Sequence, residues 1–234
     1  MRCSRGLSVA AVAGALLVVA LAAEPTGAAP VATKTPKSYA AGYVASASTV
    51  TSVEATVTLP SFTCTNKADL LSADIGVYDP TDNAFSFVTT VLACTKKKVP
   101  VYLAQLDVDS VYTYPAVVMN PGDTVTMSIS CSDTVGTSIS IDDQTTSSSG
   151  DASSATPNSC AAAFIGDEGF LKGKGKTAAP LPMFGALDYS NVTVNGDPLG
   201  SFSPIAGNYY GGKKAVIDTA SITDGGTGFT TTQG

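Results

Sequence analysis

Short runs in which apolar and polar residues alternate, separated by turn residues, recur along most of this chain. In Val50–Leu59, for example, Val53 and Val57 fall on one side and Glu54 falls on the other. A period of two is typical of strands, and the Pro-Gly, Asn-Gly and Gly-Gly pairs between runs indicate antiparallel connections. Similar runs are Asp74–Tyr78, Phe85–Leu92, Val101–Val108, Thr124–Ser130, Ser138–Ile141, Met183–Val194 and Ala215–Ile222. This pattern predicts an all-β chain of about ten to twelve strands in two packed antiparallel sheets, with under about a tenth in helix.

The composition excludes several kinds of chemistry. The chain has no His, which removes Ser-His-Asp triads, Cys-His pairs and His-ligated zinc. The chain has 13 Lys and Arg against 19 Asp and Glu, which gives a net charge of −6. An acidic chain of this kind lacks the positively charged surface that binds nucleic acid. We therefore expect no metal, no cofactor and no nucleic-acid partner.

The N-terminus carries the features of a secretory signal peptide. Arg2 and Arg5 precede an apolar run, Leu7–Ala22, and small residues follow, with cleavage expected after Ala22 or Ala29. The run is shorter than the ~20 residues that a membrane span needs. We therefore expect a secreted protein that has no membrane contact once the signal is removed.

The remaining chain divides into an arm and one domain. Residues 1–29 are assigned to the signal peptide, and residues 30–37, rich in Pro, Thr and Lys, to a flexible arm. Residues 38–234 form the predicted β-sandwich, which we expect to be a monomer. Three segments are predicted as loops: Gln144–Ser154, Gly169–Lys176 and Lys96–Lys98, the last at a hairpin tip.

Four cysteines follow the leader, and an even number in an exported chain indicates two disulfides. They are Cys64, Cys94, Cys131 and Cys160. The residues alone allow three pairings. A metal site is the poorer alternative, because the chain has neither a Cys-x-x-Cys pair nor a His.

The order of several motifs resembles that of the glutamic peptidases, or eqolisins, from Tyr39 to Thr232. The segments are SYAAGYVA, TSVEATVTLPSFTC, ADIGVYD, VYLAQLDVDSVYTYP, MNPGDTVTMSIS, AAAFIGDE, PLPMFGALDYSNVTVNG and AVIDTASITDGGTGFTTT. The resemblance implies a jelly-roll-like, lectin-like sandwich of two curved antiparallel sheets. It also implies the disulfides Cys64–Cys94 and Cys131–Cys160.

The same resemblance implies a catalytic Glu that activates water and a Gln that donates to the oxyanion. Without a gap, the Glu position falls on Asp167, with Glu168 next. A one-residue slip turns a strand side chain to the other face. Either Asp167 therefore acts with a shorter side chain, or a bulge at Gly166 re-aims Glu168.

The expected Gln is replaced. Counting back from Cys94 places Phe87 there, and Thr89 or Thr90 would offer a hydroxyl after a register shift. On the next run, Gln105 stands where the family has a cleft Trp, and Asp107 replaces its accessory Glu. Alternation puts these two side chains on one face together with Asp109. The competing interpretation is an ordinary polar strand face.

Two functions follow. Losing an oxyanion donor costs about 10²–10³ in rate and displacing the base by about 1 Å costs about 10² more. The first function is therefore an acid endopeptidase whose activity is weak or lost, with Glu168, Asp167, Gln105 and Asp107 as candidate residues. The alternative is a secreted, non-catalytic protein that binds a polypeptide or glycan in the same cleft. Tyrosines that we expect to be exposed would then line it: Tyr112, Tyr114, Tyr209 and Tyr210.

Overall fold

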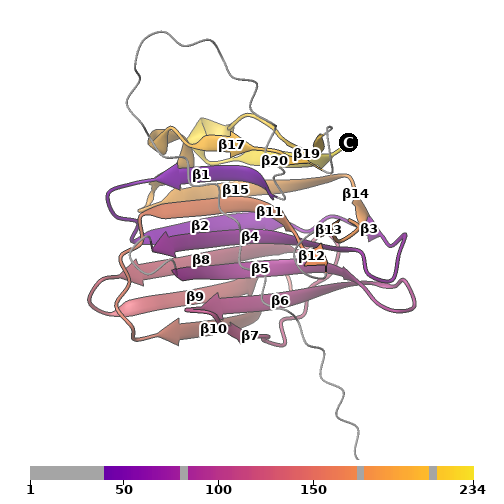
Figure 1. The fold of residues 1–234 in the computed structure, drawn as a ribbon, viewed down its shortest axis with the longest axis horizontal. Coiled ribbons are helices and arrows are strands. Elements are labelled where there is room, and N and C mark those ends of the chain that lie inside the picture. The colour runs from indigo at the N-terminus through magenta and orange to yellow at the C-terminus, as the bar shows by residue number, and fades with distance from the viewer. Residues whose placement is uncertain (1–39, 80–83, 173–176, 211–214) are drawn as a thin grey trace, which may run out of the picture.

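The computed structural model describes residues 40–79, 84–172, 177–210 and 215–234. In these residues two large antiparallel sheets stack face to face, and their strands run in nearly the same direction (Figure 1). Such aligned stacking is the arrangement of a β-sandwich, so the predicted fold class is confirmed. The predicted signal peptide and N-terminal arm lie outside the described residues.

The strand order defines the two sheets. The seven-stranded sheet runs β17 (Ile205–Gly207), β1 (Ala40–Ser46), β11 (Ala162–Gly169), β4 (Leu70–Asp79), β5 (Ala84–Cys94), β6 (Pro100–Val108) and β7 (Val111–Thr113). The nine-stranded sheet runs β10 (Ser148–Ser154), β9 (Gly136–Asp143), β8 (Thr124–Ser132), β2 (Ser52–Thr58), β15 (Ala186–Val194), β20 (Phe229–Gln233), β19 (Ala215–Thr219) and β18 (Tyr209–Tyr210), with β16 (Asp197–Pro198) paired to β15.

Short elements raise the strand count above the ten to twelve that we predicted. Two small ribbons stand outside the main sheets: β3 (Phe62–Thr63) with β14 (Met183–Phe184), and β12 (Leu171–Lys172) with β13 (Thr177–Ala178). The helical elements among the described residues are two 3₁₀ turns, η1 (Leu199–Phe202) and η2 (Asp224–Gly226). Over the same residues no helix has the length and apolar character needed to cross a membrane.

Alternation along the strands builds the core. In β2, Val53, Ala55 and Val57 are fully or almost fully buried, whereas Glu54 is exposed. In the opposite sheet, Ile75 of β4 and Ile165 of β11 are completely buried and lie directly across from each other in register. The alternate side chains of β4 and β11 therefore face away from the other sheet. We call this second surface of the seven-stranded sheet the outer face.

Both disulfides predicted from the resemblance are present. Cys64–Cys94 links the segment after β3 to the end of β5, and Cys131–Cys160 links β8 to the segment before β11. Each closes a loop of 29 or 30 residues. On the chain-entropy model, such a loop stabilises the fold by about 3–4 kcal/mol.

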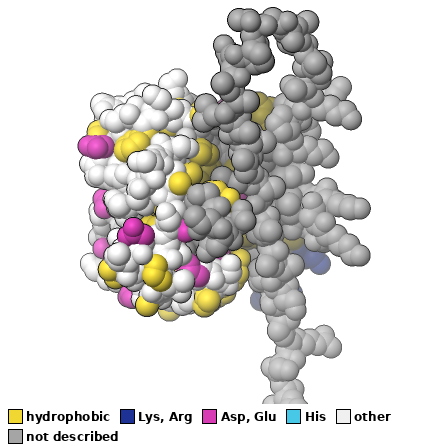
Figure 2. Space-filling view, turned by 60° about the vertical axis from the view of Figure 1, so that its left-hand side comes forward, with side chains coloured by type: hydrophobic (Ala, Val, Ile, Leu, Met, Phe, Trp, Pro, Cys, Tyr) yellow, Lys and Arg dark blue, Asp and Glu magenta, His cyan; other side chains and the backbone are white. Residues whose placement is uncertain are grey.

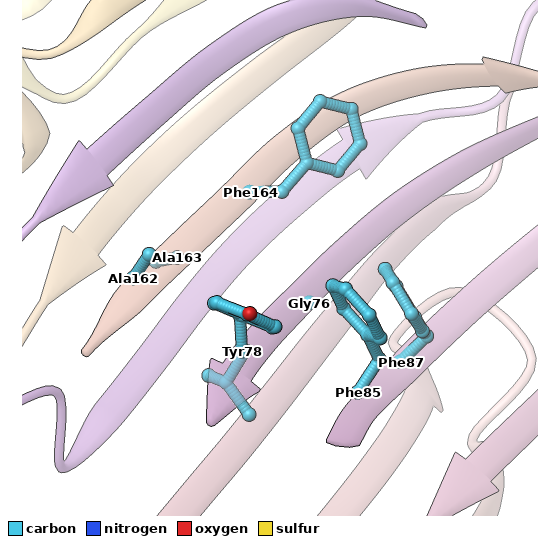
Figure 3. A pocket seen from close by; sticks show the side chains of 8 residues that line it. Gly76, Tyr78, Phe85, Phe87, Ala162, Ala163 and Phe164 are labelled. Carbon is cyan, nitrogen blue, oxygen red and sulfur yellow. The ribbon is translucent and has the colours of Figure 1, made fainter. Parts of the chain in front are cut away.

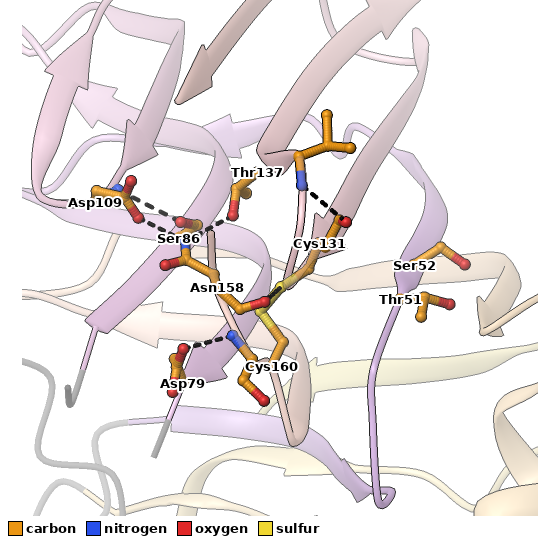
Figure 4. Close-up of a disulfide and its surroundings, with 12 residues drawn as sticks. Thr51, Ser52, Asp79, Ser86, Asp109, Cys131, Thr137, Asn158 and Cys160 are labelled. Atoms are coloured by element: carbon orange, nitrogen blue, oxygen red, sulfur yellow. Dashed lines mark hydrogen bonds between the residues drawn. A yellow bond between two sulfur atoms is a disulfide. The ribbon is translucent and has the colours of Figure 1, made fainter. Parts of the chain in front are cut away.

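Buried hydrogen bonds hold the chain around the second disulfide (Figure 4). Asn158 Nδ2 donates to Asp109 Oδ1 and to Thr137 Oγ1, both at 2.8 Å. The main-chain N–H of Ser159 donates to Asp79 Oδ2 at 2.6 Å. These contacts, together with the disulfide, fix the segment that leads directly into β11.

One predicted loop is a strand. Within Gln144–Ser154, the residues from Ser148 onward form β10, which pairs with β9 along its whole length at the edge of the sheet. Its small Ser, Gly and Ala residues lack the apolar alternation that we used to predict strands. Lys96–Lys98 lies in the turn between β5 and β6, as predicted. The prediction of a loop at Gly169–Lys176 is also wrong where it can be compared, because Gly169 ends β11 and Leu171–Lys172 forms β12. The rest of that segment lies outside the described residues.

Candidate active site

Two neighbouring carboxyl side chains of β11 face opposite sides of the seven-stranded sheet. The register of β11 with both β1 and β4 runs through Gly166 without a shift. The bulge that we considered at Gly166 is therefore absent, and ordinary alternation separates the two residues. Asp167 points to the nine-stranded sheet, where it meets Tyr189, and Glu168 points to the outer face.

Glycine is required at position 166 because β1 approaches β11 closely there. Gly166 has φ +155° and faces Gly42, which has φ +131°. A Cβ at Gly166 would lie 2.0 Å from the carbonyl oxygen of Ala41, so any larger residue would push the strands apart. The close approach fixes the position of the residues that follow on β11.

Asp167 is sealed between the two sheets. It is fully buried, and the Tyr189 hydroxyl donates to its Oδ1 at 2.6 Å. Burial raises the pKa of Asp167 to about 7, against the effect of hydrogen bonding, and raises the pKa of Tyr189 well above its usual value. Asp167 therefore does not reach the side chains on the outer face with which we had grouped it.

A second carboxyl group accompanies Glu168 on the outer face. Gly166 pairs with Asp74 of β4, and Glu168 pairs with Ser72, so Asp74 and Glu168 occupy neighbouring positions on the same surface. Glu168 is half-buried, whereas Asp74 is only 2% exposed. We refer to Asp74 and Glu168 as the carboxyl pair.

The environment of the carboxyl pair favours the protonated forms. Burial raises the pKa of Glu168 to about 7. Burial and, next in size, the charge of Glu168 raise the pKa of Asp74 well above its usual value, and hydrogen bonding by Ser72 and Thr89 only partly offsets this. Two carboxyl groups in one low-dielectric site resist simultaneous ionisation, so at weakly acid pH the pair retains a proton.

The hydrogen bonds of Ser72 fit a protonated Asp74. Ser72 Oγ lies 2.6 Å from Asp74 Oδ2 and 3.0 Å from the main-chain oxygen of Glu168. A hydroxyl has one proton and cannot donate fully to both acceptors. If Asp74 carries a proton and donates it to Ser72, then Ser72 can donate to Glu168, and both contacts are satisfied.

Polar side chains continue from Asp74 across the next two strands. Asp74 pairs with Thr89 of β5, and Thr89 pairs with Gln105 of β6, so the three side chains form one row on the outer face. Neighbouring strands lie about 4.8 Å apart, which separates the Cα atoms of Asp74 and Gln105 by about 10 Å. Of the two threonines that we considered, Thr89 lies on this face and Thr90 is completely buried on the other.

Phe87 and Asp107 lie in the adjacent row. Phe87 pairs with Gly76 of β4 on one side and with Asp107 of β6 on the other. Burial raises the pKa of Asp107, although hydrogen bonding by Tyr112 and the Ser110 main chain partly offsets this effect. The sequence grouping of Gln105 and Asp107 on one face thus matches the geometry, with Asp107 one row further from the carboxyl pair.

Asp109 and Tyr209 depart from the sequence expectations. Asp109 has φ +51°, lies after the end of β6 and accepts a hydrogen bond from Asn158, so it does not continue the row of Gln105. Tyr112 and Tyr114 are 41% and 56% exposed, as expected. Tyr209 is 1% exposed, because it packs in the core.

Sequence reasoning missed Asp74 and Ser72. Both alternate with the buried apolar residues Leu71, Ala73 and Ile75, so the signal was an acidic residue in the interior of a strongly apolar strand. Such a residue is costly to bury unless it is partnered. The sequence does not show that β4 pairs with β11. Without that pairing, nothing in the sequence indicates that Asp74 and Glu168 are neighbours on one face.

On the face shown in Figure 2, Asp and Glu side chains stand singly among uncharged and apolar ones. The described residues contain no group of three or more His, Cys, Asp or Glu side chains arranged to hold a metal ion.

Solved structures with this fold include three glutamic peptidases. Scytalido-glutamic peptidase with a peptide-based transition-state analogue matches with a TM-score of 0.69 at 18% identity, covering 84% of this chain and 98% of that one. SCP-B, an eqolisin in complex with the tripeptide Ala-Ile-His, matches with a TM-score of 0.67 at 17% identity, covering 84% and 98%. Aspergilloglutamic peptidase from Aspergillus niger matches with a TM-score of 0.58 at 17% identity, covering 70% and 99%.

Family membership rests on the sequence. A search among curated proteins gives no match. The model of the peptidase A4 family matches residues 38–230, which is most of the chain and all the strands that form the candidate site. The chain therefore belongs to the peptidase A4 family, that of the glutamic peptidases.

Proposed function

We propose that this protein is a secreted endopeptidase that hydrolyses polypeptides slowly, with Glu168 as general base and Asp74 as general acid. The observation that supports this most directly is the carboxyl pair on the outer face, in a chain of the peptidase A4 family. Two carboxyl groups whose environment keeps one proton between them can supply a base and an acid at once. The two disulfides are consistent with export, because they form in oxidising compartments.

The proposed reaction is balanced within the pair. Glu168, ionised, accepts a proton from water as the water oxygen attacks the scissile carbonyl carbon. Asp74, protonated, gives its proton to the amide nitrogen as the C–N bond breaks. Transfer of the proton from Glu168 to Asp74 restores the starting state, and one water molecule is consumed. A candidate oxyanion donor is the Gln105 side-chain amide, in the same row as Asp74.

Slow turnover follows from the donor arrangement. Thr89 stands between Asp74 and Gln105 and offers a hydroxyl in place of an amide. Removal of a well-placed oxyanion donor typically costs 10²–10³ in rate. The lack of an amide donor at the position of Thr89 also supports the second candidate function, a protein that binds polypeptides on this face without cleaving them. We propose a polypeptide rather than a glycan because the chain has no Trp for sugar stacking.

The test is digestion of a denatured protein by the purified secreted protein between pH 3 and 8, with cleavage products identified by mass spectrometry. We expect cleavage that survives chelators and inhibitors directed at Ser or Cys nucleophiles, and that Glu168→Gln and Asp74→Asn each remove. Asp142→Asn, an exposed carboxyl group in the other sheet, is the matched control. Cleavage unaffected by both site variants would contradict the proposal, and saturable binding without cleavage would favour the second function.

A further inference from the structure

A small pocket opens on the outer face one row beyond Asp74. Its lining consists of apolar and aromatic residues of β4, β5 and β11 (Figure 3). The residues that shape it are Gly76, Tyr78, Phe85, Phe87, Ala162 and Phe164. Their side chains lie on the same surface as the carboxyl pair, since Gly76 follows Asp74 in the alternation of β4 and Phe164 precedes Gly166 in that of β11.

The aromatic side chains form a stacked wall. The rings of Tyr78 and Phe85 have centroids 4.7 Å apart, and those of Phe85 and Phe87 are stacked at 5.8 Å with an interplanar angle of 16°. Tyr78, Phe85, Phe87 and Phe164 are half-buried, so each ring keeps part of its surface accessible. Close-up, Phe85 and Phe87 stand side by side on one flank of the pocket, and Phe164 stands across from them (Figure 3).

Gly76 is the residue that makes room for Phe87. A Cβ at position 76 would lie 2.4 Å from Phe87 Cε1, so the ring rests directly over the main chain of β4. The absence of a side chain at Gly76 therefore sets the floor of the pocket and the tilt of the ring. Burial of a large apolar group against such ring walls is favourable, whereas burial of an unpaired charge there is costly.

We propose that a large apolar side chain, such as Leu, Met or Phe, of a polypeptide lying along the outer face packs against the ring wall of this shallow pocket. This inference deepens the proposed function and rests on it for the occupant, because the pocket lies on the same face as the carboxyl pair, one row from Asp74. Alternate residues of a strand are about 6.7 Å apart, so the pocket lies one row from Asp74 and two from Glu168. An extended peptide has the same rise. The apolar side chain then stands two to four residues from the scissile bond.

The experiment uses peptides of one length in which a single position, two to four residues from the cleaved bond, carries Leu, Phe, Ala, Asp or Lys. Binding to the Glu168→Gln protein is measured by fluorescence anisotropy, and cleavage by the wild-type protein is measured separately. We expect Leu and Phe peptides to bind at least about 10-fold more tightly than Ala and Asp peptides, in line with the burial of one apolar side chain. Cleavage by the wild-type protein should follow the same order.

Two pocket variants and one control locate the effect. Phe87→Ala removes a wall, and Gly76→Ala displaces the same ring while all the aromatic residues remain. Both should reduce the preference for Leu over Ala to less than about 3-fold. Val135→Ala, which shortens an exposed apolar side chain in the turn between β8 and β9, should leave it unchanged. Circular dichroism and thermal unfolding check that each variant is folded.

The outcomes separate this inference from the proposed function. Cleavage without any apolar preference, or a preference that both pocket variants retain, overturns the pocket inference and leaves the peptidase proposal intact. Selective binding of Leu and Phe peptides that the pocket variants lose, without cleavage by the wild-type protein, supports the pocket and contradicts the peptidase. Absence of binding by any of the peptides overturns the pocket inference.

Discussion

Asp167 and Glu168 are adjacent on β11, yet their surroundings differ in nearly every respect. Asp167 is completely buried between the two sheets and accepts a hydrogen bond from Tyr189. Glu168 is half-buried on the outer face, where its nearest charged neighbour in the sheet is Asp74. Burial raises the pKa of both carboxyl groups to about 7.

The comparison teaches that a raised pKa alone does not identify a catalytic group. The core side of β11 gives its carboxyl group hydrogen-bond donors but no exposed surface, whereas the outer side gives it a second carboxyl group, a row of hydrogen-bonding side chains and an adjacent pocket. Only the second arrangement can bring a base, an acid and a substrate together.

The largest expected effect is on hydrolysis. Glu168→Gln removes the proposed base while keeping its shape, so we expect kcat/KM to fall by about 10²–10⁴-fold. The matched control is Glu54→Gln, which changes an exposed Glu of β2 in the other sheet. A rate assay on one peptide substrate measures both variants. Equal rates in wild type and Glu168→Gln would place the chemistry elsewhere.

The next effect is on the pH dependence of stability through Asp167. Its folded pKa of about 7 lies above the value of 3.8 for an unperturbed Asp, so its contribution is fully present below about pH 3.8 and is lost as pH rises through about 7. A shift of about 3 units corresponds to about 4 kcal/mol. We expect urea unfolding to show lower stability at pH 8 than at pH 4.

Asp167→Asn should make that decrease smaller, because the amide does not ionise. Asp142→Asn is the control, since this exposed carboxyl group of β9 should leave the decrease unchanged. Asp74 and Glu168 also have raised pKa values, so part of the decrease should persist in Asp167→Asn. If the unfolding free energy of Asp167→Asn varied with pH as much as that of the wild type, the core environment described for Asp167 would be wrong.

A further effect concerns the oxyanion donor. Gln105→Ala should lower kcat by about 10²–10³-fold and leave the unfolding midpoint nearly unchanged, because Gln105 lies on the outer face. Gln144→Ala, which changes an exposed glutamine in the turn between β9 and β10, provides the comparison. Steady-state kinetics separate kcat from KM. An increase in KM with an unchanged kcat would show that Gln105 only helps to bind substrate.

The smallest effect is on the hydrogen bond inside the core. Tyr189→Phe removes the donor to Asp167 Oδ1, so we expect a loss of about 1–3 kcal/mol in unfolding free energy. The loss should be greater at pH 8 than at pH 4, because a hydrogen bond to a charged group is stronger. Tyr114→Phe, which changes an exposed hydroxyl group, should have almost no effect. A cost equal at both pH values would contradict the ionisation that we assign to Asp167.

The sequence was sufficient for the sandwich because alternation along single strands is a local property. The buried face of β2 can be predicted from the alternation of Val53, Ala55 and Val57 alone, even when the neighbouring strands are not known. It failed at Ser148–Ser154, where an edge strand of small polar residues has no apolar period. For the site, alternation grouped Gln105 with Asp107 correctly, but the relation of Glu168 to Asp74 depends on which strands are neighbours. Those residues are 94 positions apart (168 − 74), and only the pairing of β4 with β11 joins them.

The most direct test of the central claim is the pH dependence of kcat/KM for one peptide, compared between the wild-type and Asp167→Asn proteins. A base with a pKa of about 7 on the outer face predicts a rate that falls about tenfold per pH unit below that value. In the proposed mechanism Asp167 takes no part in the chemistry, so Asp167→Asn should give the same profile under conditions in which both proteins are folded. A profile whose acid limb disappears in the folded Asp167→Asn protein would show instead that the buried carboxyl group is the catalytic one.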